Sequence, residues 1–107
     1  MIYTLEQIRD AVAPIAEKYQ IPAVYLFGSY ARGTATEESD LDFLIERPGV
    51  ELHGLQHFSI YSDFENAFEK EVDLVELDSF QQKAHRPSQV HFRENVLRER
   101  KMIYALA

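Results

Sequence analysis

A chain of 107 residues with 46% hydrophobic and 12% aromatic side chains has the size and composition of one folded domain, which excludes a disordered tail. Its formal net charge of −7 argues against direct binding to nucleic acid, and no apolar run approaches the roughly 20 residues that span a bilayer. There is no cysteine, so we expect neither disulfides nor thiolate metal sites, and we expect a cytoplasmic protein. Because no long apolar run is present, we expect no membrane partner. No repeat or linker divides the sequence, so residues 1–107 are treated as a single unit.

The first predicted element is helical and begins after Thr4. Thr4 and Gln7 have the spacing of a capping box, in which each side chain hydrogen-bonds the backbone of the other. Apolar residues then recur at helical spacing: Leu5, Ile8, Val12, Ile15 and Tyr19. Pro14 lacks the backbone N–H that a helix needs, so we expect a kink or break near Val12 and two short helical pieces before Gln20.

The rest of the chain alternates predicted strands and helices. Short apolar runs at 23–27, 41–46 and 72–77 predict three strands, and Thr34 to Ser39 is polar and loop-like. Helical spacing covers 55–70, and a further helix follows Pro87. The last apolar residues, Met102 to Leu106, fit either an extension of that helix or a short edge strand. Strands interleaved with helices in so short a chain predict an α/β (α+β) sandwich with one small mixed sheet.

A phosphate-binding turn is predicted where the first strand ends. Gly28 permits a sharp turn and a close approach of the backbone to a phosphate, and Ser29 offers a hydroxyl donor. The next residues would open a helical turn whose free N–H groups favour a triphosphate. Arg32 follows in that turn and is predicted either to reach the triphosphate or to pair with a carboxylate. The carboxylates in question are those of Glu37, Glu38 and Asp42.

Three aspartates are candidates for a metal site. Asp40 and Asp42 are two apart at the start of the second strand, so both carboxylates should leave the same face. Parallel carboxylates suit Mg²⁺ together with substrate phosphates, because the cation relieves their repulsion. Asp73, early in the third strand, would complete the cluster and accept the proton of an attacking hydroxyl if the two strands are neighbours. A Gly-Ser or an Asp-x-Asp pair taken alone is usually a turn or a surface feature, but the joint pattern favours the functional interpretation.

Histidines and aromatic residues invite other interpretations. His53 and His57 are four apart, as zinc ligands on a helix can be, but Gly54 lies between them and no third ligand is near, so a zinc site is disfavoured. Four aromatic residues of the helix predicted at 55–70 are assigned to the core rather than to a base-stacking surface: Phe58, Tyr61, Phe64 and Phe68.

Three stretches of the sequence together closely resemble the signature of the minimal nucleotidyltransferase (MNT) family, within the polymerase-beta nucleotidyltransferase superfamily. The matching residues are Gly28-Ser29-Tyr30-Ala31-Arg32-Gly33, Glu38-Ser39-Asp40-Leu41-Asp42 and Glu71-Val72-Asp73-Leu74-Val75. The resemblance implies a polymerase-beta-like fold. It also implies that Asp40, Asp42 and Asp73 are the metal-binding and catalytic carboxylates, and that Gly28 and Ser29 form the phosphate-binding turn.

The same resemblance implies a function. Family members of this length commonly act as antitoxins of a HEPN-type RNase toxin. By that resemblance the chain is expected to use Mg²⁺ (or Mn²⁺) and ATP to transfer AMP to a tyrosine hydroxyl of such a toxin. The alternative is a non-catalytic binding module that neutralises its partner by forming a complex. Transfer to an antibiotic or to RNA is disfavoured, because neither an acceptor domain nor a basic groove is visible in the sequence.

Overall fold

The computed structural model describes residues 2–46, 54–76 and 94–105. The elements follow in the order α1 (Leu5–Tyr19), β1 (Ala23–Phe27), α2 (Gly28–Arg32), β2 (Leu41–Ile45), α3 (Gly54–Phe68), β3 (Val72–Glu76) and β4 (Lys101–Ala105). A further helical segment spans residues 94–99. Within the described ranges, no helix has the length and apolar character needed to cross a bilayer.

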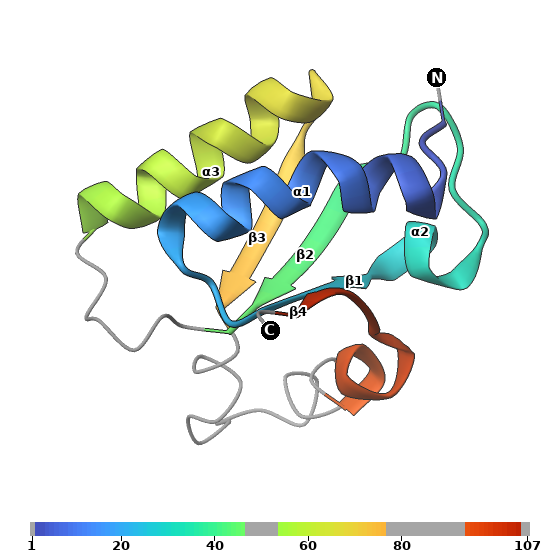
Figure 1. The fold of residues 1–107 in the computed structure, drawn as a ribbon. Coiled ribbons are helices and arrows are strands. Elements are labelled where there is room, and N and C mark those ends of the chain that lie inside the picture. The colour runs from blue at the N-terminus through green and yellow to red at the C-terminus, as the bar shows by residue number, and fades with distance from the viewer. Residues whose placement is uncertain (1, 47–53, 77–93, 106–107) are drawn as a thin grey trace.

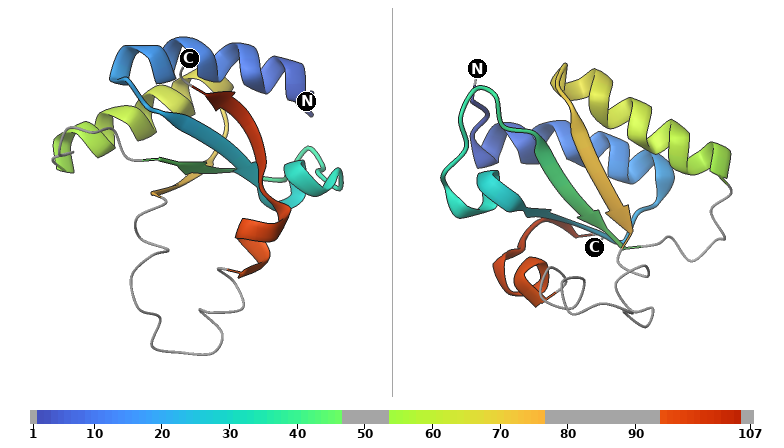
Figure 2. Two further views of the ribbon diagram at one scale, coloured as in Figure 1. Left: turned by 60° about the horizontal axis from the view of Figure 1, so that its bottom comes forward. Right: turned by 180° about the vertical axis from the view of Figure 1, so that it is seen from behind.

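The strands form one mixed sheet in the order β3-β2-β1-β4. β1 is antiparallel to both β2 and β4, whereas β2 and β3 are parallel and are connected through α3. α1 and α3 cover one face of the sheet, and the helical segment 94–99 lies on the other side (Figures 1 and 2). This arrangement confirms the predicted α/β sandwich with a small mixed sheet.

The first helix is continuous, which corrects the expectation of two short pieces. Its start is as predicted, because Thr4 and Gln7 exchange both hydrogen bonds of the capping box, at 3.1 and 2.9 Å. Pro14 lies on the exposed side of α1, and so does Asp10, whose carbonyl loses its helical partner. Water can satisfy that carbonyl, so the proline costs less here than in a buried turn. The opposite side packs into the core and holds the helix together: Ile8, Val12, Ile15 and Ala16.

The two faces of the sheet carry separate apolar clusters, as the alternation of side chains along a strand requires. The face under α1 and α3 includes Val24, Leu26, Leu41, Phe43, Ile45 and Val72. The opposite face includes Ala23, Tyr25, Phe27 and Leu44, with Val96 packed against them. Asp42 and Asp73 alternate with residues of the first cluster, so both emerge on the second face, beside the segment 94–99.

The aromatic residues of α3 are only partly in the core. Phe64 and Phe68 are buried and stack on Phe43, with ring centroids 5.0 and 5.6 Å apart. Phe58 is 65% exposed, so its assignment to the core was wrong. The reason is helical geometry: Phe58 lies about 200° around the helix from the buried Ile60, two residues later.

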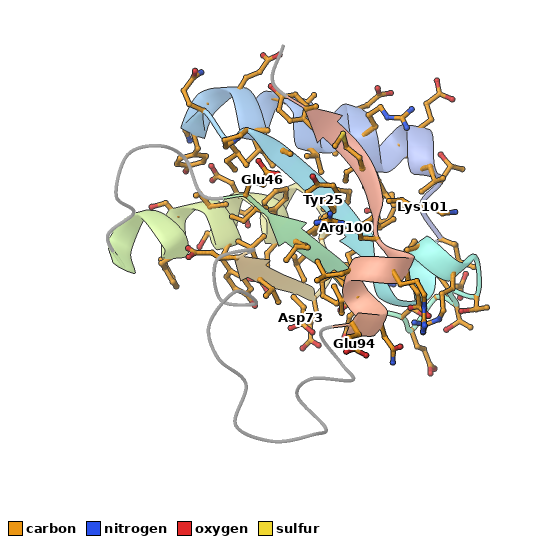
Figure 3. All side chains as sticks on the ribbon, turned by 90° about the horizontal axis from the view of Figure 1, so that it is seen from below. Tyr25, Glu46, Asp73, Glu94, Arg100 and Lys101 are labelled. Carbon is orange, nitrogen blue, oxygen red and sulfur yellow. The ribbon has the colours of Figure 1, made fainter. Side chains whose placement is uncertain are left out.

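The C-terminal residues form an edge strand, which decides between the two alternatives left open by the sequence. β4 pairs with β1, and Ile103 is buried between the exposed Met102 and the half-buried Tyr104. The segment before β4 is fixed to the second face of the sheet. There the Arg100 guanidinium lies over the Tyr25 ring at 4.4 Å, and the Tyr25 hydroxyl donates to Glu46 Oε1 at 3.2 Å (Figure 3).

Some predictions fall outside the described residues. They include Pro87 and the start of the helix predicted after it, Leu77 and Leu106 at strand ends, and the loop before α3. The positions of His53, His85 and His91 and the side chain of His57 also lie outside. The judgement against a zinc site there stays a prediction.

Candidate active site

The turn between β1 and α2 is built around a glycine. Gly28 has φ +74°, a left-handed conformation that favours glycine, and a Cβ at this position would overlap the Asp42 carboxylate, 3.0 Å from its Cγ. Phe27 stands at the N-cap and supplies no side-chain hydrogen bond, so the first N–H groups of α2 have no side-chain cap. Gly33 ends the helix, with its N–H donated to the Ser29 carbonyl. The chain therefore brings the backbone of the predicted phosphate turn directly against an aspartate.

Asp42 and Asp73 form a close carboxylate pair across the parallel strands. They are register partners of β2 and β3, and both side chains line the same cavity. Burial raises the pKa of Asp42 to about 6, and the charge of Asp73, its hydrogen bond and the charge of Asp40 act in the same direction. The positive charge of Arg32 opposes this rise. The predicted neighbourhood of strands two and three is confirmed.

Asp40 is exposed and lies just before β2, close enough for its charge to raise the pKa of Asp42. A closed turn precedes it: Thr36 N–H donates to Ser39 Oγ at 2.8 Å, and Ser39 N–H donates to the Thr36 carbonyl at 3.0 Å. The Lys70 ammonium donates to the carbonyl of Glu37 at 2.5 Å and so ties the turn to the segment before β3. This contact between distant segments had no signal in the sequence.

A cavity of about 360 Å³ brings most of the predicted site together. Its lining comprises Phe27, Gly28, Arg32, Asp42, Asp73, Val75, Asn95, Val96 and Glu99. Three of these come from the helical segment 94–99, whose first described residue, Glu94, lies near Asp73 in the view of Figure 3. Sequence reasoning missed these three residues, although the spacing of Asn95 and Glu99, four apart on a predicted helix, gave them a common face. Ser29 and Asp40 do not line the cavity.

Arg32 has a carboxylate partner that the sequence did not suggest. Its Nη1 donates to Glu99 Oε2 at 3.2 Å, so the ion pair links α2 to the segment 94–99. The candidates considered from the sequence were local because only local spacing is visible there. Asp42, one of them, interacts with Arg32 through charge.

The donor set fits a divalent cation whose coordination is completed by substrate. In the described part of the chain, no three His, Cys, Asp or Glu side chains are arranged to hold a metal by themselves. However, Mg²⁺ is commonly held by one or two carboxylates together with phosphate oxygens and water. Asp42 and Asp73 suit that role, because a cation would relieve the repulsion that raises the pKa of Asp42. The part of Asp40 as a ligand stays a prediction.

A buried hydroxyl next to the turn yields a stability prediction. Tyr30 is 6% exposed, and among the described residues its hydroxyl has no hydrogen-bond partner. An unsatisfied buried hydroxyl costs about 1–3 kcal/mol, so Tyr30→Phe should raise the free energy of unfolding by about 1 kcal/mol. Urea unfolding of both proteins measures the difference. A loss of stability in the variant would mean that the hydroxyl is satisfied, by water for example.

The sequence matches a known family and a curated relative. The family model described as "Polymerase beta, Nucleotidyltransferase" matches residues 10–106. The "Putative protein adenylyltransferase MJ1379" of Methanocaldococcus jannaschii is 35% identical over 80 residues, which are 67% of this chain and 77% of the relative. The family match contains the turn at Gly28, Asp40 and Asp42 within a similarity that spans most of the chain.

Solved structures agree with this assignment. A structure described as "Structure of putative minimal nucleotidyltransferase" has a TM-score of 0.66 and 32% identity, over 92% of this chain and 95% of that one. A chain from the complex of a tri-AMPylated Shewanella oneidensis HEPN toxin with its MNT antitoxin has a TM-score of 0.65, over 96% of this chain and 74% of that one. Its 16% identity shows a shared fold only. This chain belongs to the polymerase-beta nucleotidyltransferase family, as a minimal nucleotidyltransferase.

Proposed function

We propose that this nucleotidyltransferase is an antitoxin that uses ATP and Mg²⁺ to transfer AMP to a tyrosine hydroxyl of a HEPN-type toxin. The observation that carries the proposal is the Asp42–Asp73 pair, which lies against the Gly28 turn in a single cavity. A phosphate-binding turn beside two close carboxylates is what a metal-assisted phosphoryl-group transfer requires. The absence of cysteine agrees with a cytoplasmic reaction, where ATP is available.

The chemistry assigns a role to each part of the site. The tyrosine oxygen attacks the α-phosphorus of ATP, the bond from that phosphorus to the bridging oxygen of the β-phosphate breaks, and pyrophosphate leaves. The phenolic proton passes to Asp73, which is exposed and therefore accessible to an acceptor. Asp42 and Asp73 would hold Mg²⁺, which neutralises charge on the phosphates. The backbone at Gly28 and the side chains of Ser29 and Arg32 would orient the triphosphate.

Charge supports a protein partner for this small domain. The net charge of −7 would attract a basic RNase and steer the encounter. A phenol is a suitable acceptor because its pKa of ~10 allows a carboxylate and a cation to activate it. Attached AMP adds negative charge where a toxin must bind RNA phosphates, so repulsion would silence it. Two comparisons motivate this partner: the relative named as a protein adenylyltransferase and the neighbour solved with a tri-AMPylated HEPN toxin.

Intact-mass spectrometry tests the proposal directly. The chain is incubated with a HEPN-type toxin, ATP and Mg²⁺, and the toxin is expected to gain the mass of one or more AMP groups on tyrosine. Chelation of Mg²⁺ should prevent the gain. A toxin that stays unmodified and is nonetheless inhibited, equally by Asp42→Asn, would instead support the binding module that acts by complex formation.

A further inference from the structure

The ion pair between Arg32 and Glu99 is part of the lining of the candidate nucleotide site. Among the described residues that line the cavity, Arg32 is the one cation, and it shares the lining with the carboxylates of Asp42, Asp73 and Glu99. Asp42 and Asp73 come from the strands and contact each other. Glu99 comes from the opposite wall and contacts Arg32 instead. Its charge therefore needs an explanation separate from the metal site.

The exposed ion pair between Arg32 and Glu99 can be replaced by a stronger interaction of Arg32 with phosphate. The side chains of Arg32 and Glu99 are 49% and 32% exposed, and an ion pair this open to water contributes little net free energy. A triphosphate carries several charges and matches the planar guanidinium with two parallel hydrogen bonds. A nucleotide entering the cavity would therefore compete successfully with Glu99 for Arg32.

We propose that Glu99 is a positioning residue that holds Arg32 in the nucleotide-free protein and releases it to the triphosphate when nucleotide binds. This inference rests on the proposed binding of ATP at the cavity. It has a structural consequence, because the pair joins α2 to the segment 94–99. That segment leads through Arg100 into β4. Nucleotide binding would thus break an ion pair that links the phosphate turn to the C-terminal part of the fold.

A double-mutant cycle on nucleotide affinity tests this exchange without any transfer reaction. Isothermal titration with AMP-PNP and Mg²⁺ is performed on the wild type, Glu99→Gln, Arg32→Gln and the double variant. Glu99→Gln keeps the side-chain shape and removes the charge, so the affinity should rise about two- to five-fold, the range of an exposed ion pair. Arg32→Gln should weaken binding about ten-fold or more, as expected for loss of a charged hydrogen bond. In the Arg32→Gln background the gain from Glu99→Gln should disappear or nearly disappear.

Glu17→Gln is the control, since it removes the same charge at an exposed residue of α1 outside the cavity. It should leave the affinity unchanged. An equal gain from Glu99→Gln with and without Arg32 would mean general repulsion and would overturn the exchange. Weaker binding by Glu99→Gln would also overturn it, because Glu99 would then contact the nucleotide. If the wild type binds no AMP-PNP, the proposed function itself fails; if it binds and Glu99→Gln is not tighter, only this inference fails.

Discussion

Asp42→Asn should reduce AMP transfer by at least about a hundredfold while leaving the protein folded. Loss of a residue that merely orients a metal ligand costs about 10–100-fold, and Asp42 is a candidate ligand itself. The fold should persist because an asparagine amide can donate to the Asp73 carboxylate across the same register pair. A transfer assay with labelled ATP measures the loss, and circular dichroism checks the fold. Asp10→Asn, an exposed change on α1, is the control and should transfer at the wild-type rate.

The same variant should be more stable than the wild type at neutral pH. The folded-state pKa of Asp42, about 6, lies above its ordinary value of 3.8, so the folded protein holds this proton more tightly than the unfolded chain does. The contribution of this proton to the free energy of unfolding is complete below pH about 4 and is lost as the pH rises through about 6. Discounted for the partial exposure of the group, the gain from asparagine above pH 6 is about 1 kcal/mol.

Melting curves from pH 4 to 7.5 can follow this difference. The advantage of Asp42→Asn should grow between pH 4 and 6.5 and then stay constant, because Asp42 of the wild type is ionised above that range. Added Mg²⁺ with AMP-PNP should stabilise the wild type more than the variant. Wild-type transfer by Asp42→Asn, or a stability difference that does not depend on pH, would contradict the assignment of Asp42.

Gly28→Ala should lower the free energy of unfolding by about 2–4 kcal/mol. The left-handed conformation costs about 1–2 kcal/mol with a Cβ, and the overlap with the Asp42 carboxylate adds a cost of the size of core overpacking. This is a large fraction of the 5–15 kcal/mol that holds a typical domain together. Transfer should fall as well, because relief of the overlap requires either the turn or the carboxylate to move.

Gly33→Ala separates the two costs. Gly33 has a similar φ of +77°, but among the described residues no atom lies within 4 Å of the position that a Cβ would take there, so only the conformational cost of about 1–2 kcal/mol applies. Urea unfolding of both variants provides the comparison. Equal losses of stability would show that the Asp42 carboxylate moves aside without a cost in free energy, so that its close approach to Gly28 does not affect stability.

Local sequence patterns predicted most of the secondary structure, since they depend on residues a few positions apart. The capping box of Thr4, the strands β1, β2 and β3, and the turn at Gly28 all follow from such patterns. The continuity of α1 through Pro14 did not, because it depends on which side of the helix faces water. The exposure of Phe58 had the same origin, since its place depends on how α3 is rotated against the sheet.

The candidate site was predictable only as far as it is local or carried by the family signature. The spacing of Asp42 within its strand indicated the face, and the resemblance indicated the partner Asp73, which the register of β2 and β3 then confirmed. The pairing of Arg32 with Glu99 joins residues 67 positions apart, and nothing in either neighbourhood indicates it. Contacts of this kind depend on the complete fold.

The alternation of β2 gives insertions and deletions unequal consequences. Leu41 and Phe43 face the layer of α1 and α3, whereas Asp42 faces the cavity. Adding a single residue early in this strand would exchange the two sets and would bury a carboxylate among phenylalanines. An addition near Thr34, in the loop before the strand, leaves the parity of β2 untouched. Chain length in this family can therefore drift in the loop, while the strand must change by whole pairs of residues.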